Sequence, residues 1–360
     1  MKINKLLGLS LLSAVFFASC TDEEIIYKEN PAPVSKGAYE NGILVMNEGN
    51  FGQPNAEVSF ISAQYPTLFQ NNIFNVVNPT KVLGNTGQSI GFNGDNAYIV
   101  LNGDNKIEVV NRYTFVSVAT IQTGLQNPRY ISFANGKGYV TNWGDAGVAT
   151  DDYVAVLNLT TNQITGNIAV VEGPEQIITY NNNLYVAHKG GYGFNDKISV
   201  INSTSNTVQT TITVGDVPSV IEVSQDNLYV LCSGKPSWAG AETGGKLVKV
   251  NLANNTVAQT LDFGATEHPG FMDIENGTIY YMKGKGVYQK DVATATLPTT
   301  PTFTSTATTV YGFAAHNNKI YVGDALNYVD NGKVFVTTMT GAALNTYTVG
   351  VMPNGFYFNN

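Results

Sequence analysis

The sequence predicts an all-β protein, a seven-bladed β-propeller whose blades are four-stranded antiparallel sheets. Three observations support this fold class. The composition is typical of many short strands joined by tight turns. A unit of roughly 40–50 residues repeats along the chain. Each end of the chain carries part of one further unit, and the two parts complement each other.

The composition argues against several classes of partner. Of the 360 residues, 43% are hydrophobic and 11% are aromatic, whereas only 13% are charged, about half the usual share. This hydrophobic content is ample for a buried core, and the 36 glycines favour turns. The net charge is −8 and no long basic stretch occurs. Nucleic acid and anionic lipid headgroups, which attract clustered Lys and Arg, are therefore not expected as partners.

The repeat is marked by a tyrosine in the second strand of each predicted unit. A short turn rich in Asn, Asp and Gly precedes each of these tyrosines, as in 93–96 and 135–137. Asn and Gly tolerate the positive φ of two-residue hairpin turns, so the turn and the tyrosine together predict a β-hairpin. The six tyrosines are 41 to 51 residues apart: Tyr98, Tyr139, Tyr185, Tyr229, Tyr280 and Tyr321.

The seventh blade is predicted from the two ends of the chain. The tail 352–358 resembles the first strand of a unit, and the chain then ends without a second strand. Segment 43–47 has the character of a second strand, with no first strand before it. We therefore expect the C-terminal strand to complete the N-terminal blade and close the ring. This closure would remove the free sheet edges that favour aggregation.

Residues 139–142 read Tyr-Val-Thr-Asn, the motif that names the YVTN group of propeller proteins. Segment 197–230 also resembles this group closely. The resemblance extends over nearly the whole of the expected mature chain. It implies the propeller fold and says little about function, because one fold hosts many activities.

The first residues are predicted to be a lipoprotein signal peptide. Lys2 and Lys5 precede an apolar run over 6–17, which is too short to span a bilayer but fits a secretion signal. Small residues then precede Cys20, as they do at the cleavage and lipidation site of bacterial lipoproteins. We expect 1–19 to be removed and Cys20 to carry acyl chains. An ordinary cleaved signal followed by an incidental cysteine is the alternative.

The segment after Cys20 indicates where in the cell the protein is located. Residues 21–24 read Thr-Asp-Glu-Glu, an acidic patch that resembles the surface-export signal of Bacteroidetes lipoproteins. Residues 20–40 are expected to form a flexible tether and 41–360 the propeller. The expected location is the cell surface, on the outer membrane, with the lipid anchor as the only membrane contact. Cys232 is expected to be a small buried apolar residue.

The expected strand order separates two kinds of loop. Turns between the first and second strands, and between the third and fourth, are short and share one face of the ring. Longer loops between the second and third strands share the other face with the connections between blades. Aromatic rings in Gly-rich loops have little core to pack into, which makes them candidates for ligand contact. The alternatives are rings folded back over the mouth and a merely solvated channel lining. The candidate ligand-binding residues are Asn47, Phe51, Arg129, Tyr130, Trp143, Glu175, Gln176, His188, Tyr192, Phe194, Trp238, Tyr311 and Tyr328.

The sequence offers no convincing case for catalysis. The three histidines, His188, His268 and His316, lack metal-ligand spacing with one another or with a cysteine. Residues 87–91 match G-x-S-x-G, but a nucleophile elbow needs a helix after the serine, and a turn and a strand are expected there. We therefore predict a binding protein rather than an enzyme, with no catalytic residue, metal ligand or cofactor.

Residues 47–52 read Asn-Glu-Gly-Asn-Phe-Gly. With the repeat and the lipoprotein signal, they resemble the BtuG-type cobalamin-binding proteins of Bacteroidetes. The resemblance implies capture of a corrinoid, or another large amide-rich small molecule, and delivery to an outer-membrane TonB-dependent transporter. Aromatic faces suit the apolar parts of such a ring, while Asn, Gln and Tyr suit its amides. Two alternatives remain: an adhesion or scaffolding propeller that binds protein or glycan, and a metal-dependent lyase or lactonase.

Overall fold

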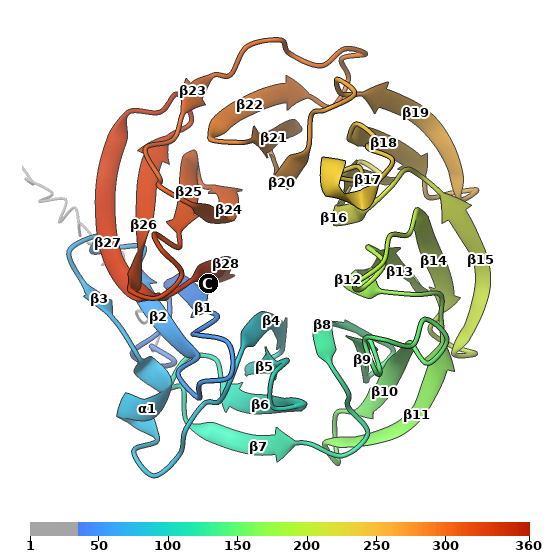
Figure 1. The fold of residues 1–360 in the computed structure, drawn as a ribbon. Helices are drawn as coiled ribbons and strands as arrows, with labels where there is room; N and C mark the ends of the chain where they lie inside the picture. Colours follow the sequence, from blue (N-terminus) through green and yellow to red (C-terminus); the bar gives the residue numbers. More distant parts are fainter. Residues whose placement is uncertain (1–34) are drawn as a thin grey trace, which may run out of the picture. The chain divides into compact units, whose positions relative to one another are not determined.

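Seven four-stranded antiparallel sheets surround a central axis in the computed structural model, which describes residues 35–360 (Figure 1). The predicted fold class and the number of blades are confirmed. The signal peptide expected at 1–19, the lipidation site at Cys20 and most of the expected tether lie outside the described residues. Among the described residues, no helix has the length and apolar character needed to cross a membrane.

The first blade joins the two ends of the chain, as predicted. The strand β28 pairs antiparallel with β1, with Phe358 opposite Ile43. A short helix, α1 (Ile73–Val77), follows this blade and buries two apolar side chains. From the axis outward, the strands of the first blade are β28 (Pro353–Asn359), β1 (Gly42–Asn47), β2 (Glu57–Ser62) and β3 (Phe69–Gln70).

Each of the other six blades uses four consecutive strands, with the first of them innermost. The second blade contains β4 (Gly87–Asn93), β5 (Asn96–Leu101), β6 (Lys106–Asn111) and β7 (Ser117–Ile121). The third contains β8 (Pro128–Ala134), β9 (Lys137–Asn142), β10 (Tyr153–Asn158) and β11 (Gln163–Ala169). The fourth contains β12 (Pro174–Tyr180), β13 (Asn183–His188), β14 (Lys197–Asn202) and β15 (Thr207–Thr213).

The remaining blades follow the same order. The fifth contains β16 (Pro218–Ser224), β17 (Asn227–Cys232), β18 (Lys246–Asn251) and β19 (Thr256–Asp262). The sixth contains β20 (Pro269–Glu275), β21 (Thr278–Lys283), β22 (Gly286–Asp291) and β23 (Phe303–Thr304). The seventh contains β24 (Val310–His316), β25 (Lys319–Asp324), β26 (Asn331–Thr338) and β27 (Ala343–Val351).

The repeating tyrosines lie in the second strands, where each is no more than 7% exposed. The turns before them adopt positive φ, as at Asn135 and Gly136, whose φ angles are 49° and 71°. Each of these tyrosines is the third residue of its strand. In the first blade the third residue of the second strand, β1, is Leu44, which is fully buried. Six tyrosines therefore mark seven blades because one blade places leucine at this position.

The hydrophobic core lies between neighbouring blades. Leu44 and Phe60 of the first blade, for example, pack in one cluster with Ile99 of the second. Cys232 belongs to a cluster shared by the fourth and fifth blades and has no exposed surface. Burial raises the pKa of its thiol. The prediction that Cys232 is a small buried apolar residue is confirmed.

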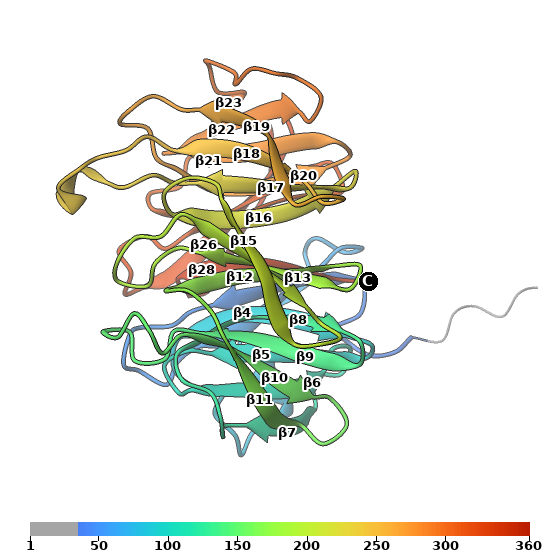
Figure 2. The same cartoon turned by 90° about the vertical axis from the view of Figure 1, so that its right-hand side faces the viewer.

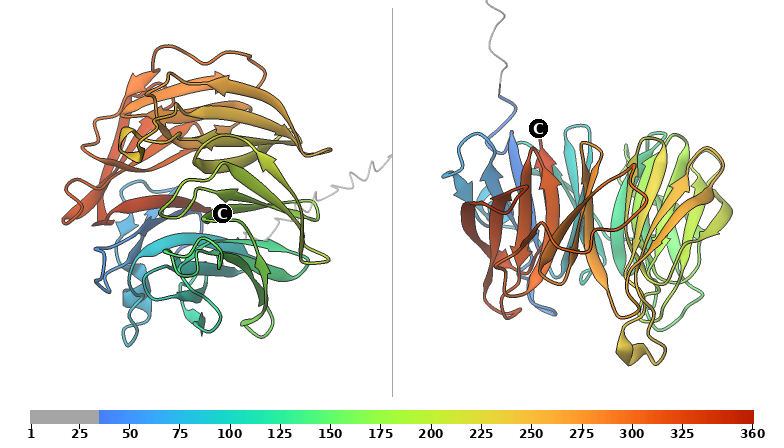
Figure 3. Two further views of the ribbon diagram at one scale, coloured as in Figure 1. Left: turned by 45° about the vertical axis from the view of Figure 1, so that its right-hand side comes forward. Right: turned by 90° about the horizontal axis from the view of Figure 1, so that it is seen from above.

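The ring has two faces that differ in their loops (Figure 2). The turn face carries the connections between first and second and between third and fourth strands, together with the C-terminus. The loop face carries the connections between second and third strands and between blades. Figure 3 shows the short helix η1 (Ser237–Ala239), coloured yellow, on the opposite side from the C-terminus. The sixth blade differs, since only residues 284–285 join β21 to β22.

The innermost strands are tied to each other by side chains. An innermost strand has one edge with no paired strand, so its backbone groups need other partners. Three acidic or amide side chains supply such partners by accepting a hydrogen bond from the backbone N–H of the next blade. The pairs, with their distances, are Gln176 with Ile221 (2.9 Å), Glu222 with Ile274 (2.9 Å) and Asp273 with Ala315 (2.8 Å).

Candidate functional site

In every blade but the sixth, the last residue of the second strand is buried inside the protein. Asn47 and His188, both predicted to bind ligand, end β1 and β13 and have no exposed surface. Asn47 donates a hydrogen bond to Ser59 Oγ at 2.9 Å, and His188 Nε2 lies 2.8 Å from Ser199 Oγ. Burial lowers the pKa of His188 to about 4. The structure therefore encloses both side chains between strands, away from any ligand that approaches from solvent.

The next residue along the chain turns toward the mouth of the channel, because side chains alternate in direction along a strand. Glu48 follows Asn47, and Lys189 follows His188. Trp143 and Ser233 occupy the same position after β9 and β17. Sequence reasoning selected Trp143 but missed Glu48 and Lys189. Aligning the repeats by the end of the second strand would have found them.

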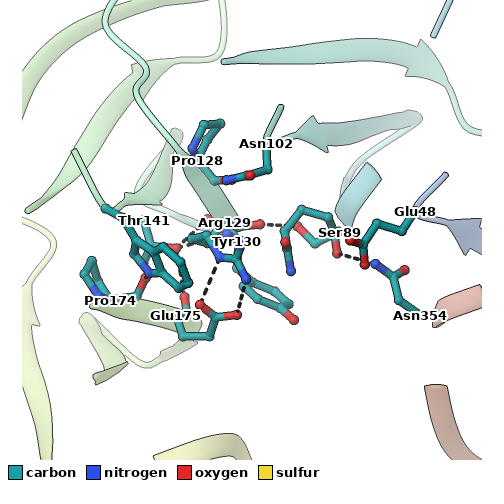
Figure 4. A network of polar contacts seen from close by, with 12 residues as sticks. Glu48, Ser89, Asn102, Pro128, Arg129, Tyr130, Thr141, Pro174, Glu175 and Asn354 are labelled. Atoms are coloured by element: carbon teal, nitrogen blue, oxygen red, sulfur yellow. Dashed lines mark hydrogen bonds and ion pairs between the residues drawn. The ribbon is translucent and has the colours of Figure 1, made fainter. Parts of the chain in front are cut away.

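A buried ion pair stands at the mouth (Figure 4). Arg129, on β8, donates from Nε and Nη2 to the two carboxylate oxygens of Glu175, on β12, at 2.9 and 2.8 Å. Only 12% and 5% of these side chains are exposed. Burial alone would raise the pKa of Glu175, but the positive charges of Arg129 and Lys189 hold it below its usual range. The pair is therefore charged and fixed in position.

Trp143 is held against this ion pair. The Arg129 guanidinium lies 4.1 Å from the centre of the Trp143 ring, a cation–π contact. The indole Nε1 donates to the Pro174 carbonyl at 3.0 Å. The Tyr192 ring approaches the Trp143 ring edge-on, with the two centroids 6.2 Å apart. These contacts connect the third and fourth blades at the loop face.

A second group of side chains comes from the first and seventh blades. The Tyr311 hydroxyl donates to Glu48 Oε2 at 2.7 Å, and the rings of Tyr311 and Tyr328 are 5.9 Å apart. Burial raises the pKa of Glu48, although the hydrogen bond from Tyr311 opposes this shift. Asn50 donates to the Tyr328 carbonyl at 3.0 Å. Phe51, next to Asn50, is 89% exposed.

The innermost strands enclose a channel cavity of about 610 Å³. Tyr130, Glu175 and Gln176, all predicted, are among its lining residues. Burial raises the pKa of Tyr130 to about 12. Across residues 35–360, no group of three or more His, Cys, Asp or Glu side chains is arranged to hold a metal ion.

An aromatic cleft of about 340 Å³ opens beside the channel cavity. Tyr192 and Phe194 reach it from the β13–β14 loop, and Trp238 reaches it from η1. The Phe194 and Trp238 rings are 5.6 Å apart. Tyr192 and Trp238 are nevertheless 80% and 78% exposed. Three predicted aromatic residues thus surround one hollow on the loop face. We define this aromatic cleft by its lining: Lys189, 191–194, Val217, 233–234, Pro236, Trp238 and His268.

Comparisons with known proteins bear on this geometry. Residues 41–352 match a protein family described as a domain of unknown function, DUF5074. The chain belongs to this DUF5074 family. A search of curated proteins finds no match for it.

Solved structures resemble this DUF5074 member in fold. A quinonprotein alcohol dehydrogenase-like protein from Bacteroides thetaiotaomicron shares 14% identity over 89% of this chain and 79% of its own, with a TM-score of 0.66. A functionally unknown protein from Desulfotomaculum acetoxidans shares 12% over 88% and 98%, with a TM-score of 0.65. BamB from Moraxella catarrhalis shares 13% over 90% and 86%, with a TM-score of 0.53. At these identities the likeness concerns the fold alone.

Proposed function

We propose that this DUF5074 member is a surface lipoprotein whose loop face captures a corrinoid and delivers it to an outer-membrane TonB-dependent transporter. The proposed role is binding without catalysis. One observation carries the proposal: Tyr192, Phe194 and Trp238 surround a cleft that opens beside the channel cavity. Large aromatic rings at such high exposure are typical of surfaces that meet a ligand.

The energy available from this cleft is substantial. Covering one aromatic ring removes roughly 150–250 Å² from water, and each Å² contributes about 25 cal/mol. Each ring therefore contributes on the order of 4 kcal/mol before the costs of immobilising the ligand. Cavities of about 340 and 610 Å³ lie within the usual range of small-molecule sites. The two hollows together suit a ligand larger than either one.

The polar lining suits a ring with amides on its edge. Gln176 and Asn354 line the channel cavity, as do the hydroxyls of Ser219 and Ser233. Amide and hydroxyl groups can both donate and accept hydrogen bonds, so they match the amides around a corrin ring. The rings of the aromatic cleft would then cover its apolar parts.

The attachment point of the expected tether also fits this role. Asn359 Nδ2, at the end of β28, donates to the Tyr39 carbonyl at 2.6 Å. The chain therefore joins the propeller on the turn face, opposite the loop face (Figure 3).

Isothermal titration with cyanocobalamin tests the proposal. We expect saturable binding that Trp238→Ala and Tyr192→Ala each weaken by at least about tenfold, because each removes an exposed contact ring. Tyr65→Ala is the matched control, since this tyrosine is 57% exposed but belongs to the turn face. No heat of binding and no colour retained on the purified protein would refute corrinoid capture.

A second candidate function rests on Phe51. This ring is 89% exposed and lies in a different loop from the rings of the aromatic cleft. Such a ring can stack on a sugar or meet a protein surface, as an adhesion or scaffolding propeller would require. A glycan array, compared between the parent protein and Phe51→Ala, distinguishes the two functions. Glycan binding lost in Phe51→Ala, with no corrinoid binding, would favour adhesion.

A further inference from the structure

The aromatic cleft and the channel cavity meet at three residues. Lys189, Val217 and Ser233 line both of them. Lys189 directly follows β13, Val217 directly precedes β16, and Ser233 directly follows β17. The junction therefore lies between the fourth and fifth blades. A ligand placed in the cleft would therefore reach the channel cavity past these three side chains.

Lys189 brings a positive charge with no direct contact partner to the junction. Its backbone is fixed, since Lys189 N donates to the Gly173 carbonyl at 2.9 Å. Within residues 35–360 its side-chain ammonium makes no hydrogen bond and no ion pair within 4 Å, and its charge acts on the carboxyl groups of Glu175 and Glu48 at longer range. Two nitrogens of Arg129 bind the Glu175 carboxylate directly, so Lys189 acts on this carboxylate only at longer range. A partly buried ammonium without a direct contact partner is a group that gains from an incoming anion.

A second basic side chain, His268, lines the same cleft. His268 Nδ1 lies 2.9 Å from the Ser233 carbonyl, and His268 Nε2 lies 3.0 Å from Glu242 Oε1. Both neighbours are hydrogen-bond acceptors, so this environment favours the doubly protonated imidazole. The hydrogen bond to Glu242 is the main reason that the pKa of His268 is raised. Lys189 thus differs from His268, since its ammonium acts on Glu175 and Glu48 only at longer range and makes no direct contact with a carboxylate.

We propose that the junction binds the anionic group of a ligand whose aromatic or apolar ring system occupies the aromatic cleft, with Lys189 as the charge partner. A carboxylate, a sulfonate or a phosphodiester satisfies this chemistry. The inference deepens the proposed function, because it describes the same loop face and rests on it. For a corrinoid, the group in question is the phosphodiester of the nucleotide arm.

A matched pair of fluorescent probes tests the site without any corrinoid. Anilinonaphthalene sulfonate and phenylnaphthylamine share one ring system, and only the first carries an anionic group. We expect the sulfonate to bind more tightly than the neutral probe. Lys189→Met should weaken sulfonate binding about 10- to 100-fold, the range for a charged hydrogen bond, and leave the neutral probe within about twofold.

Two further variants locate the effect. Trp238→Ala should weaken both probes, because the ring wall is lost while the protein keeps its fold at an exposed position. Lys137→Met removes a lysine at the start of β9, next to a hairpin turn of the turn face, and should change neither probe. The inference is overturned if Lys189→Met leaves sulfonate binding unchanged, or if it weakens both probes equally.

A corrinoid pair separates this inference from the proposed function. Cobinamide lacks the nucleotide arm and its phosphodiester, whereas cobalamin has both. Lys189→Met should weaken cobalamin and leave cobinamide unchanged. If neither corrinoid binds the parent protein, the corrinoid function fails and the probe pair alone decides the anion site. If both bind and neither cobalamin nor the sulfonate responds to Lys189→Met, the function stands and the anion site fails.

Discussion

At the scale of single residues, the Tyr-Val-Thr-Asn motif serves to join blades. The Tyr139 hydroxyl donates to the Ser203 carbonyl at 2.8 Å, in a turn of the next blade. Thr141 Oγ1 donates to the Glu175 carbonyl at 2.8 Å, also in the next blade. Asn142 Oδ1 accepts a hydrogen bond from the Gln126 backbone N–H at 3.0 Å. Each polar side chain of the motif therefore satisfies a backbone group, which explains why the motif reports fold rather than function.

The repeating tyrosines give a matched test of this role. The buried hydroxyl of Tyr229 has no hydrogen-bond partner among the described residues, unlike that of Tyr139. We expect Tyr139→Phe to lower the free energy of unfolding by about 1–2 kcal/mol, because it leaves a carbonyl unsatisfied. Tyr229→Phe should be neutral or slightly stabilising. Urea unfolding measures both, and equal losses in the two variants would contradict this account.

At the residue scale, two of the predicted ligand-binding residues lie one position before the residues that turn toward the channel. Asn47 and His188 were selected because they border Gly-rich loops with aromatic residues. Their neighbours Glu48 and Lys189 turn toward the mouth of the channel instead, since the side chains of a strand alternate between two directions. The sequence of a loop does not reveal whether the last side chain of the preceding strand points into the core or toward the channel. That direction depends on the pairing register, which the neighbouring strands set.

At the scale of elements, the innermost strands β16 and β20 bring two carboxyl groups together. Glu222 accepts from the Ile274 backbone N–H at 2.9 Å, and Asp273 accepts from the Ala315 backbone N–H at 2.8 Å. Burial is the main cause that raises the pKa of both carboxyl groups, and their mutual proximity raises that of Glu222 further. We therefore expect the folded protein to keep a proton on this pair to a higher pH than the unfolded chain does.

This pair predicts a pH dependence of stability. In the unfolded chain both carboxyl groups ionise near pH 4. Because the folded pKa values are higher, the folded protein binds more protons, and stability falls as the pH rises from about 4 through the raised values. Glu222→Gln keeps an acceptor for Ile274 and removes one charge. It should raise the free energy of unfolding at pH 8 by about 1–3 kcal/mol and flatten the pH profile.

Denaturant unfolding between pH 5 and pH 8 measures this effect. Asp95→Asn is a suitable control, because the Asp95 side chain is 71% exposed in a hairpin turn. Its pH profile should follow that of the parent protein. A Glu222→Gln variant with an unchanged slope would mean that the pair does not hold a proton in the folded state.

At the scale of the whole molecule, closure of the ring depends on eight C-terminal residues that begin at Pro353. The strand β28 pairs with β1 along its length, and Asn359 donates to the Tyr39 carbonyl. Without β28, the first blade would lose its innermost strand and expose β1 as an unpaired edge. The two ends of the propeller meet at this point, so they can be joined.

Two rearrangements of the chain test closure. Deletion of 353–360 should abolish cooperative thermal unfolding and promote aggregation, since it opens the ring. A circular permutant that joins Asn360 to Lys36 through a short Gly-Ser linker, with new ends in the largely exposed stretch 293–301, should keep a single transition close to that of the parent. Circular dichroism and light scattering measure both. Equal stability of the deletion variant would show that closure contributes little.

The sequence by itself determined the propeller, the number of blades and the strand that closes the ring, because hairpin turns, strand patterns and repeat length are local properties of the chain. It also selected the aromatic rings of the loop face, since those rings lie outside any alternating pattern. Only the tertiary structure decided that Tyr192, Phe194 and Trp238 surround one cleft and that Lys189 lies where this cleft meets the channel cavity. Those relations join residues from different blades. They depend on packing between blades, which no local pattern encodes.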